Sequence, residues 1–267
     1  MLGSWESCVV AYSGGVDSAF LALAAKRALG DRALAVIADS PSLPRRELAE
    51  ATALASRFQI PLRIVNTAEF ANPDYTANPV NRCYFCKHEL FSVLEQIAAQ
   101  EGFQVLAYGE NASDLGDFRP GAQAAREFQV RAPLKELGFT KDDIRTLSAQ
   151  LGLPTADKPQ MPCLASRIPY GTMVTVERLT QVGGAEADLR AMGLKNFRVR
   201  YHGEIARIEV APDEVARFAS ADFREQVNAA LRRRGFKFAA LDLEPFRSGR
   251  LNEAAGVARP ILEAREG

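Results

Sequence analysis

Short apolar runs typical of strands alternate along the first 150 residues with segments whose apolar residues repeat at helical spacing. Four runs are expected to be strands: Ser7–Tyr12, Leu34–Ala38, Leu62–Val65 and Val105–Tyr108. Three segments are expected to be helices: Ala19–Leu29, Arg45–Phe58 and His88–Gln100. A fourth helix is expected to begin at Thr140, where the sequence has a capping-box pattern. This order predicts an α/β fold, a parallel sheet with helices on both faces and ligands at the carboxyl ends of its strands.

The pattern changes after about residue 153. Prolines at 154, 159, 162 and 169 predict a connecting segment without regular structure. Beyond it, helical and strand-like runs follow in the order helix, strand, strand, helix, strand: Val176–Met192, Phe197–Tyr201, Ile205–Val210, Asp213–Arg233 and Lys237–Leu243. We expect a small C-terminal α+β domain. The predicted division is residues 1–152, a connector at 153–172, and residues 173–267.

Composition narrows the class of protein. The 33 basic and 33 acidic residues balance, which argues against a nucleic acid backbone as the main partner. No apolar run approaches the roughly 20 residues that span a bilayer, so no membrane role is expected. The N-terminus lacks the basic and apolar regions of a secretory signal, and four cysteines are too few for a disulfide framework. We therefore expect a cytoplasmic protein.

The loop between the first strand and the first helix carries the strongest chemical signal. Its sequence, Tyr12-Ser-Gly-Gly-Val-Asp-Ser18, places two glycines, two hydroxyls and a helix N-terminus together, which favours a phosphate site. A carboxylate beside phosphates needs a bridging cation, so Asp17 predicts Mg²⁺. The plainer interpretation is an ordinary capped helix start. The predicted phosphate-binding residues are Ser13, Gly14, Gly15, Val16, Asp17 and Ser18.

The pattern S-G-G-x-D-S resembles the signature of the PP-loop ATP pyrophosphatases, whose fold is of the adenine nucleotide alpha-hydrolase type. The resemblance implies that ATP is cleaved between its α and β phosphates to give an adenylated intermediate and pyrophosphate. Further candidates for the nucleotide site follow the second and fourth strands, where the sheet's ligand edge is expected: Ser40, Asn111, Asp114 and Arg119. The alternative for the segment Gly109–Gly121 is a plain polar loop.

Three cysteines lie in two further motifs. Cys83 and Cys86 form a C-x-x-C pair, and Cys163 opens the segment Cys163-Leu-Ala-Ser-Arg-Ile-Pro-Tyr-Gly171. The pair alone is compatible with a redox disulfide, with a zinc site completed by His88, or with an iron–sulfur cluster. Cys8 lies inside an apolar strand and is expected to be a buried core residue.

Over almost its whole length the chain resembles the LarE family of ATP-dependent sulfur transferases. The resemblance rests on the S-G-G-V-D-S loop, on Gly109–Gly121, on Cys163–Gly171 and on Arg198-Val-Arg-Tyr-His202. It implies a pyridinium carboxylate mononucleotide as substrate, a precursor of a nickel-pincer nucleotide cofactor. ATP would adenylate its carboxylate, a cysteine sulfur would displace AMP, and the carbon–sulfur bond would then break to leave a thiocarboxylate. Cys163 matches the sulfur-bearing residue.

The resemblance also implies how the cysteines are used. Members with three such cysteines hold a 4Fe–4S cluster whose fourth iron is open to an extra sulfide, and members with one consume it to leave dehydroalanine. Because the chain has Cys83, Cys86 and Cys163, we expect the cluster route, with sacrifice of Cys163 as the alternative. The source of sulfide stays open, and the family further implies a homo-oligomer.

Arg198 and Arg200 alternate along a predicted strand, so both side chains emerge on one face. The resemblance places such a pair, together with Glu186, around the substrate's phosphate and the sulfur, so all three join Cys163 and Asp17 as predicted catalytic residues. The plainer interpretation is a solvated charged face. Arg167 offers positive charge near Cys163. Two other functions compete: a PP-loop tRNA thiolase, against which the neutral charge argues, and a nucleotide-binding regulatory module.

Overall fold

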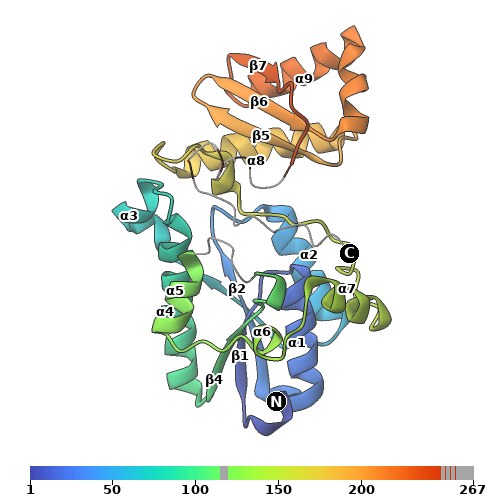
Figure 1. Cartoon of the computed structure of the whole chain (residues 1–267). Coiled ribbons are helices and arrows are strands. Elements are labelled where there is room, and N and C mark those ends of the chain that lie inside the picture. The colour runs from blue at the N-terminus through green and yellow to red at the C-terminus, as the bar shows by residue number, and fades with distance from the viewer. Residues whose placement is uncertain (115–119, 248–249, 251–252, 254–255, 257–267) are drawn as a thin grey trace. The chain divides into compact units, whose positions relative to one another are not determined.

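The computed structural model describes residues 1–114, 120–247, 250, 253 and 256. The chain divides into two compact units (Figure 1). The first contains Met1–Asn72 and Asn81–Met161, and the second contains Pro73–Val80 and the described residues between Pro162 and Gly256. No helix in the described part of the chain combines the length and the apolar character that a membrane crossing requires.

A four-stranded parallel sheet forms the centre of the first unit, as predicted (Figure 1). Its strands are β1 (Cys8–Ala11), β2 (Ala33–Asp39), β3 (Leu62–Asn66) and β4 (Val105–Tyr108). They lie in the order β3-β2-β1-β4, and Val9 of β1 pairs with Leu34 on one side and Leu106 on the other. The carboxyl ends of all four strands lie at one edge.

Helices cover both faces of this sheet, which confirms the α/β prediction. On one face Cys8 and Val10 pack with residues of α1 (Val16–Leu29), α2 (Arg45–Arg57) and α7 (Lys141–Gln150). On the other face Val9 and Ala11 pack with α4 (Arg82–Glu101) and α5 (Pro120–Glu127). Cys8 has no exposed surface, and burial raises the pKa of its thiol to about 12, so it is the core residue that the sequence predicts.

Helix α4 begins at Arg82, earlier than the predicted start at His88. The N–H of Tyr84 already donates to the carbonyl of Asn81, and the Tyr84 ring packs against the sheet's second core cluster. This packing extends the helix toward its N-terminus. Cys83 and Cys86 therefore lie in its first two turns, not in a loop before it.

The second unit has the predicted order, with α8 (Val176–Ala191), β5 (Phe197–His202), β6 (Ile205–Val210), α9 (Ala221–Arg233) and β7 (Phe238–Leu241). Strand β6 is central, antiparallel to β5 and parallel to β7. The helix predicted over Asp213–Arg233 is interrupted at Ser220, whose hydroxyl accepts from the N–H of Phe223 and caps α9. A 3₁₀ helix precedes it.

The remaining helices are short. They are α3 (Pro73–Thr76), α6 (Pro133–Glu136) and the 3₁₀ helices Leu2–Ser4, Gly30–Arg32, Glu69–Ala71, Ala112–Asp114, Leu164–Arg167 and Pro212–Ala219. The segment with α3 joins the second unit through buried Asn78. Its amide nitrogen donates to the carbonyls of Ile168, Pro169 and Thr172 at 3.3, 2.7 and 2.9 Å.

Candidate active site

The loop between β1 and α1 forms the turn that the sequence predicts. Gly15 is the N-cap of α1, and among the described residues no side chain caps this helix. The first backbone N–H groups of a helix lack partners within it, and they lie at the positive end of its dipole. They are therefore available to an anion. Val16 and Asp17 are the first residues of the helix.

The two loop serines are coupled. The N–H of Ser13 donates to Ser18 Oγ at 3.1 Å, and the two hydroxyls lie 3.0 Å apart. Ser18 Oγ in turn donates to the carbonyl of Gly15 at 3.2 Å. These bonds close the loop on itself and fix the direction of the Ser13 hydroxyl, which is exposed.

Gly14 meets two requirements that only glycine satisfies. Its φ is +70°, and a Cβ built there would lie 2.6 Å from Cβ of Ala51 in α2. We expect Gly14→Ala to destabilise the protein by about 2–4 kcal/mol, combining left-handed strain with overpacking. The matched control is Gly102→Ala, where φ is +76° but nothing lies within 4 Å, so that only the strain of about 1–2 kcal/mol applies. Urea unfolding midpoints measure both, and equal midpoints would contradict the steric argument.

Gly109, at the end of β4, allows an equally close approach. A Cβ there would lie 2.8 Å from the backbone nitrogen of Ser18. The end of β4 thus packs directly on the first turn of α1. This contact brings the segment after β4 against the Ser13–Ser18 loop.

Among the described residues of the first unit, the Asp17 carboxylate accepts hydrogen bonds from Asn111 and Lys141. Nδ2 of Asn111 donates to its Oδ1 at 3.3 Å, and Nζ of Lys141 donates to its Oδ2 at 2.6 Å. Asn111 is held by its own turn, because its Oδ1 accepts from the N–H of Ser113 and its N–H donates to Asp114 Oδ2. The structure therefore brings together three predicted residues, Asp17, Asn111 and Asp114. Lys141 was not predicted.

Two predicted nucleotide-binding residues remain, Ser40 and Arg119. Ser40 follows β2 at the same edge of the sheet, where it is buried and donates to Oε1 of Glu69. The other carboxylate oxygen of Glu69 is buried without a hydrogen-bond partner among the described residues. Arg119 lies outside the described residues.

A segment after α7 reaches the loop from a distant part of the chain. Nζ of Lys158 lies 2.8 Å from Glu47, 3.1 Å from Glu50 and 3.5 Å from the carbonyl of Gly14. Arg145 holds the segment by donating to the carbonyls at positions 156 and 158. Lys158 thus braces the loop. A lone lysine in a proline-rich segment carries no local signal that would have revealed this.

In the second unit, the segment around Cys163 is held by a buried arginine. The guanidinium of Arg167 donates to both carboxylate oxygens of Glu186 at 2.9 and 3.1 Å. It also donates to the carbonyls of Pro162 and Cys163 at 2.7 and 3.2 Å. Arg167 has no exposed surface, so its charge fixes the backbone beside the partly exposed Cys163 instead of facing solvent.

The other predicted residues of this unit join the same network. Glu186 also accepts from the N–H of Val199 at 3.1 Å, and Arg200 donates to the carbonyl of Ser166 at 2.7 Å. Arg200 and Arg198 are both buried, so they do not form the solvated face that was the alternative. Arg200 is paired with Glu209.

Arg198 is the more strongly desolvated of the two arginines. Its guanidinium lies 4.5 Å from the ring centroid of Phe246. Burial, together with the positive charge of Arg167, lowers the pKa of Arg198 to about 10. It therefore remains charged at neutral pH.

The cysteines differ in accessibility. Cys83 is exposed and Cys86 partly exposed, one helical turn apart on one face of α4 near its N-terminus, where the dipole favours negative charge. Three accessible thiols match the ligand chemistry of an iron–sulfur cluster. Within the described residues no three His, Cys, Asp or Glu side chains are grouped around a common point for a metal ion. The ring of His88 packs on Tyr84 and Phe128.

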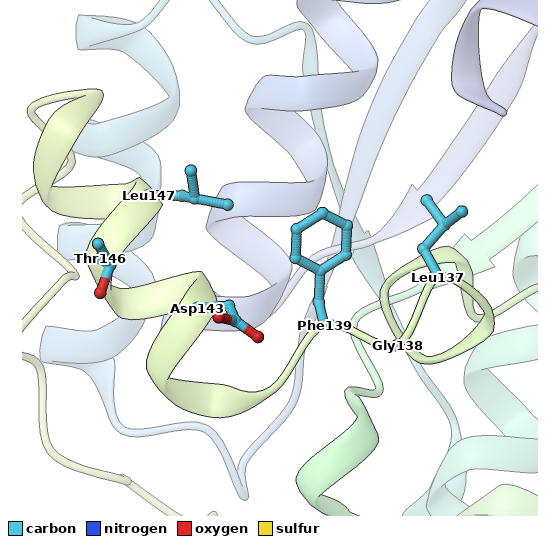
Figure 2. Close-up of a pocket in the computed structure, with 6 residues that line it drawn as sticks. All are labelled: Leu137, Gly138, Phe139, Asp143, Thr146 and Leu147. Atoms are coloured by element: carbon cyan, nitrogen blue, oxygen red, sulfur yellow. The ribbon is translucent and has the colours of Figure 1, made fainter.

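A surface hollow of about 350 Å³ lies beside the start of α7 (Figure 2). It is lined by Leu137, Gly138, Phe139, Asp143, Thr146 and Leu147. None of the predicted site residues lines it. Asp143 forms the capping box with Thr140, and Phe139 packs on Phe20. Because both side chains already stabilise the fold, we assign no binding role to the hollow.

Some known proteins resemble part of the chain, and others resemble almost all of it. A family model for NAD synthase matches residues 3–77. Pyridinium-3,5-bisthiocarboxylic acid mononucleotide synthase of Lactiplantibacillus plantarum is 36% identical over 256 residues, covering 95% of this chain and 92% of that protein. An uncharacterized protein of Synechocystis is 46% identical over 250 residues, covering 94% and 93%. The glutamine-hydrolyzing GMP synthase of Carboxydothermus hydrogenoformans is 30% identical over 166 residues, covering 56% and 32%.

Proposed function

The chain belongs to the LarE family, and we propose that it inserts sulfur into a pyridinium carboxylate mononucleotide in the synthesis of a nickel-pincer nucleotide. That it is an ATP-dependent enzyme that transfers sulfur follows from the family. The partial likeness to GMP synthase and NAD synthase agrees with a shared ATP-cleaving unit, while the likeness to the mononucleotide synthase extends over the second unit as well.

The first unit performs the activation in this proposal. A substrate carboxylate oxygen attacks the α-phosphorus of ATP, the bond from that phosphorus to the bridging oxygen breaks, and pyrophosphate leaves with the electron pair. The loop Ser13–Ser18 binds the phosphates, and Asp17 supplies a carboxylate oxygen to Mg²⁺, a hard cation that prefers oxygen ligands. When bound, Mg²⁺ neutralises charge on the phosphates. The observation that carries this assignment is the uncapped start of α1 with Asp17 in its first turn.

The second unit carries Cys163, the residue that this proposal assigns to sulfur transfer. In the route that consumes the cysteine, the thiolate of Cys163 attacks the acyl adenylate carbon and AMP leaves, which gives a thioester. Glu186, Arg198 and Arg200 are assigned to the substrate's phosphate and to the sulfur. Glu186 and Arg200 also hold the segment around Cys163 in place. Glu186 accepts a hydrogen bond from Arg167, and Arg200 donates one to the carbonyl of Ser166.

Two routes then differ in the fate of Cys163. In the sacrificial route its Cβ–S bond breaks, a base removes the α-proton, and dehydroalanine remains with a thiocarboxylate product. We favour the alternative in which Cys83, Cys86 and Cys163 hold a 4Fe–4S cluster. Bound there, the cluster would supply an iron with a free coordination position for sulfide. That sulfide, in place of the Cys163 thiolate, would displace AMP from the acyl carbon, so that the cysteine is retained. The support is the presence of three accessible thiols. A cytoplasmic location and a homo-oligomer stay predictions.

Pyrophosphate release is the direct test of the proposed activation. With ATP and Mg²⁺, we expect pyrophosphate to form only when pyridinium-3,5-biscarboxylic acid mononucleotide is added, because its carboxylate is the nucleophile. Nicotinic acid mononucleotide and tRNA serve as comparison substrates. Pyrophosphate formed equally without any acceptor, or only with tRNA, would contradict the proposal, and the tRNA result would favour a thiolase.

A further inference from the structure

One residue of the Ser13–Ser18 loop, Asp17, forms an ion pair that must break if Asp17 is to bind Mg²⁺ as proposed. Nζ of Lys141 lies 2.6 Å from Oδ2 of Asp17, the same carboxylate that is assigned to Mg²⁺. Lys141 is the first residue of α7, whereas Asp17 lies in the first turn of α1. Both side chains are partly exposed, at 34% for Lys141 and 19% for Asp17, so a ligand can reach the pair.

We propose that Lys141 binds ATP by exchanging partners, an inference that rests on the proposed function. In the ligand-free protein its ammonium neutralises Asp17. When MgATP binds, Asp17 turns to Mg²⁺ and Lys141 turns to the oxygens of the two phosphates that leave as pyrophosphate.

Charge is the first argument for the exchange. A divalent cation on the Asp17 carboxylate would stand beside the Lys141 ammonium, and two positive charges at that distance repel. The ammonium must then find another anion. The nearest anion that the reaction provides is the phosphate chain at the start of α1, where the helix dipole and the free N–H groups also favour it.

The second argument is that Lys141 can move without disturbing the fold. Its backbone N–H donates to Ser113 Oγ at 3.0 Å, and the capping box between Thr140 and Asp143 fixes the start of α7. These bonds do not involve the side chain. The ammonium sits on a flexible four-carbon stem with three donors, so it can rotate from one acceptor to another.

The exchange contributes to both binding and reaction. Pyrophosphate gains negative charge as the bond to the α-phosphorus breaks, and a cation already placed on it stabilises that charge. Before ATP arrives, the same ammonium competes with Mg²⁺ for Asp17. Lys141 therefore links metal binding at Asp17 to the presence of nucleotide.

The test compares Lys141→Ala with Lys26→Ala. Lys26 lies at the opposite end of α1 and pairs with Asp31 at the same distance of 2.6 Å, so it loses an equivalent ion pair far from the loop. Calorimetric titration with α,β-methylene-ATP, which cannot be cleaved at the reacting bond, measures binding without turnover. Urea unfolding confirms that both variants are folded.

We expect Lys141→Ala to weaken binding of the analogue by about 10- to 100-fold, the effect of losing a charge-assisted hydrogen bond. In the absence of the analogue, we expect the Mg²⁺ concentration for half-maximal binding to fall about two- to fivefold, because a competing surface cation is gone. Asp17→Asn should raise that Mg²⁺ concentration. Lys26→Ala should change neither quantity.

Two results would overturn the exchange alone: analogue binding by Lys141→Ala that equals that of Lys26→Ala, or a Mg²⁺ requirement that rises as it does in Asp17→Asn. The first would mean that Lys141 is only structural, and the second that it helps to hold the metal site. Failure of the unsubstituted chain to bind ATP would overturn the proposed function, and the exchange with it.

Discussion

Replacing Cys163 by alanine is expected to abolish sulfur transfer and to leave ATP cleavage intact. Activation is assigned to the Ser13–Ser18 loop, which belongs to the unit that lacks Cys163. The variant should therefore still form AMP and pyrophosphate from ATP and the mononucleotide. Because the variant has neither the Cys163 thiolate nor the third cysteine ligand of a cluster, the acyl adenylate should be lost to water, and no sulfur should appear in the product.

The fold should tolerate this change. Cys163 is partly exposed, and Arg167 holds the segment through backbone carbonyls that alanine keeps. The matched control is Cys8→Ala, which removes the buried thiol of β1 and should retain transfer. Product analysis by mass spectrometry measures both. A thiocarboxylate made by the Cys163→Ala variant would contradict the role of Cys163, and loss of AMP formation would contradict the separation of the two steps.

Breaking the Arg167–Glu186 pair is expected to have the largest effect on stability. The Arg167 guanidinium has no exposed surface, and its nitrogens contact Glu186, two backbone carbonyls and Ser166 Oγ. Arg167→Met leaves the carboxylate of Glu186 buried and uncompensated, which costs about 3–5 kcal/mol. Removing both charges together, as Arg167→Met with Glu186→Met, should recover part of that loss because no charge remains unpaired.

A matched exposed pair on the same helix gives the comparison. Asp188 of α8 receives two hydrogen bonds from Arg234, at 2.8 and 2.6 Å, but the Arg234 side chain is 40% exposed. Arg234→Met should therefore cost only about 0.2–1 kcal/mol. Urea unfolding followed by circular dichroism measures all the variants. Equal losses for Arg167→Met and Arg234→Met would show that burial does not set the strength of the Arg167 pair.

Local patterns were sufficient for the strands and for the turn between β1 and α1. Strands β5 and β6, the parallel sheet and the capping box at Thr140 each follow from periodicity or from residues adjacent in the sequence. The loop Ser13–Ser18 was found because its chemistry lies within six consecutive positions. Such features depend on near neighbours, which a single sequence displays.

Contacts between distant segments could not be predicted in this way. Lys141 and Lys158 reach the loop from more than a hundred residues away, and nothing beside them in the sequence distinguishes them from surface lysines. The burial of Arg167 was missed because arginine is usually exposed, and only packing against α8 reveals it. Helix α4 starts early because Tyr84 finds a place on the sheet.

The most direct test of sulfur transfer is mass spectrometry of both product and protein after anaerobic turnover with ATP, Mg²⁺, the mononucleotide and sulfide. We predict a product in which sulfur replaces a carboxylate oxygen, with AMP formed alongside. The chain should keep an intact Cys163 and purify with about four irons if its cysteines hold a cluster. Dehydroalanine at position 163, together with the absence of iron, would contradict the cluster route and favour sacrifice of the cysteine. AMP formation with no sulfur in the product would contradict the central claim.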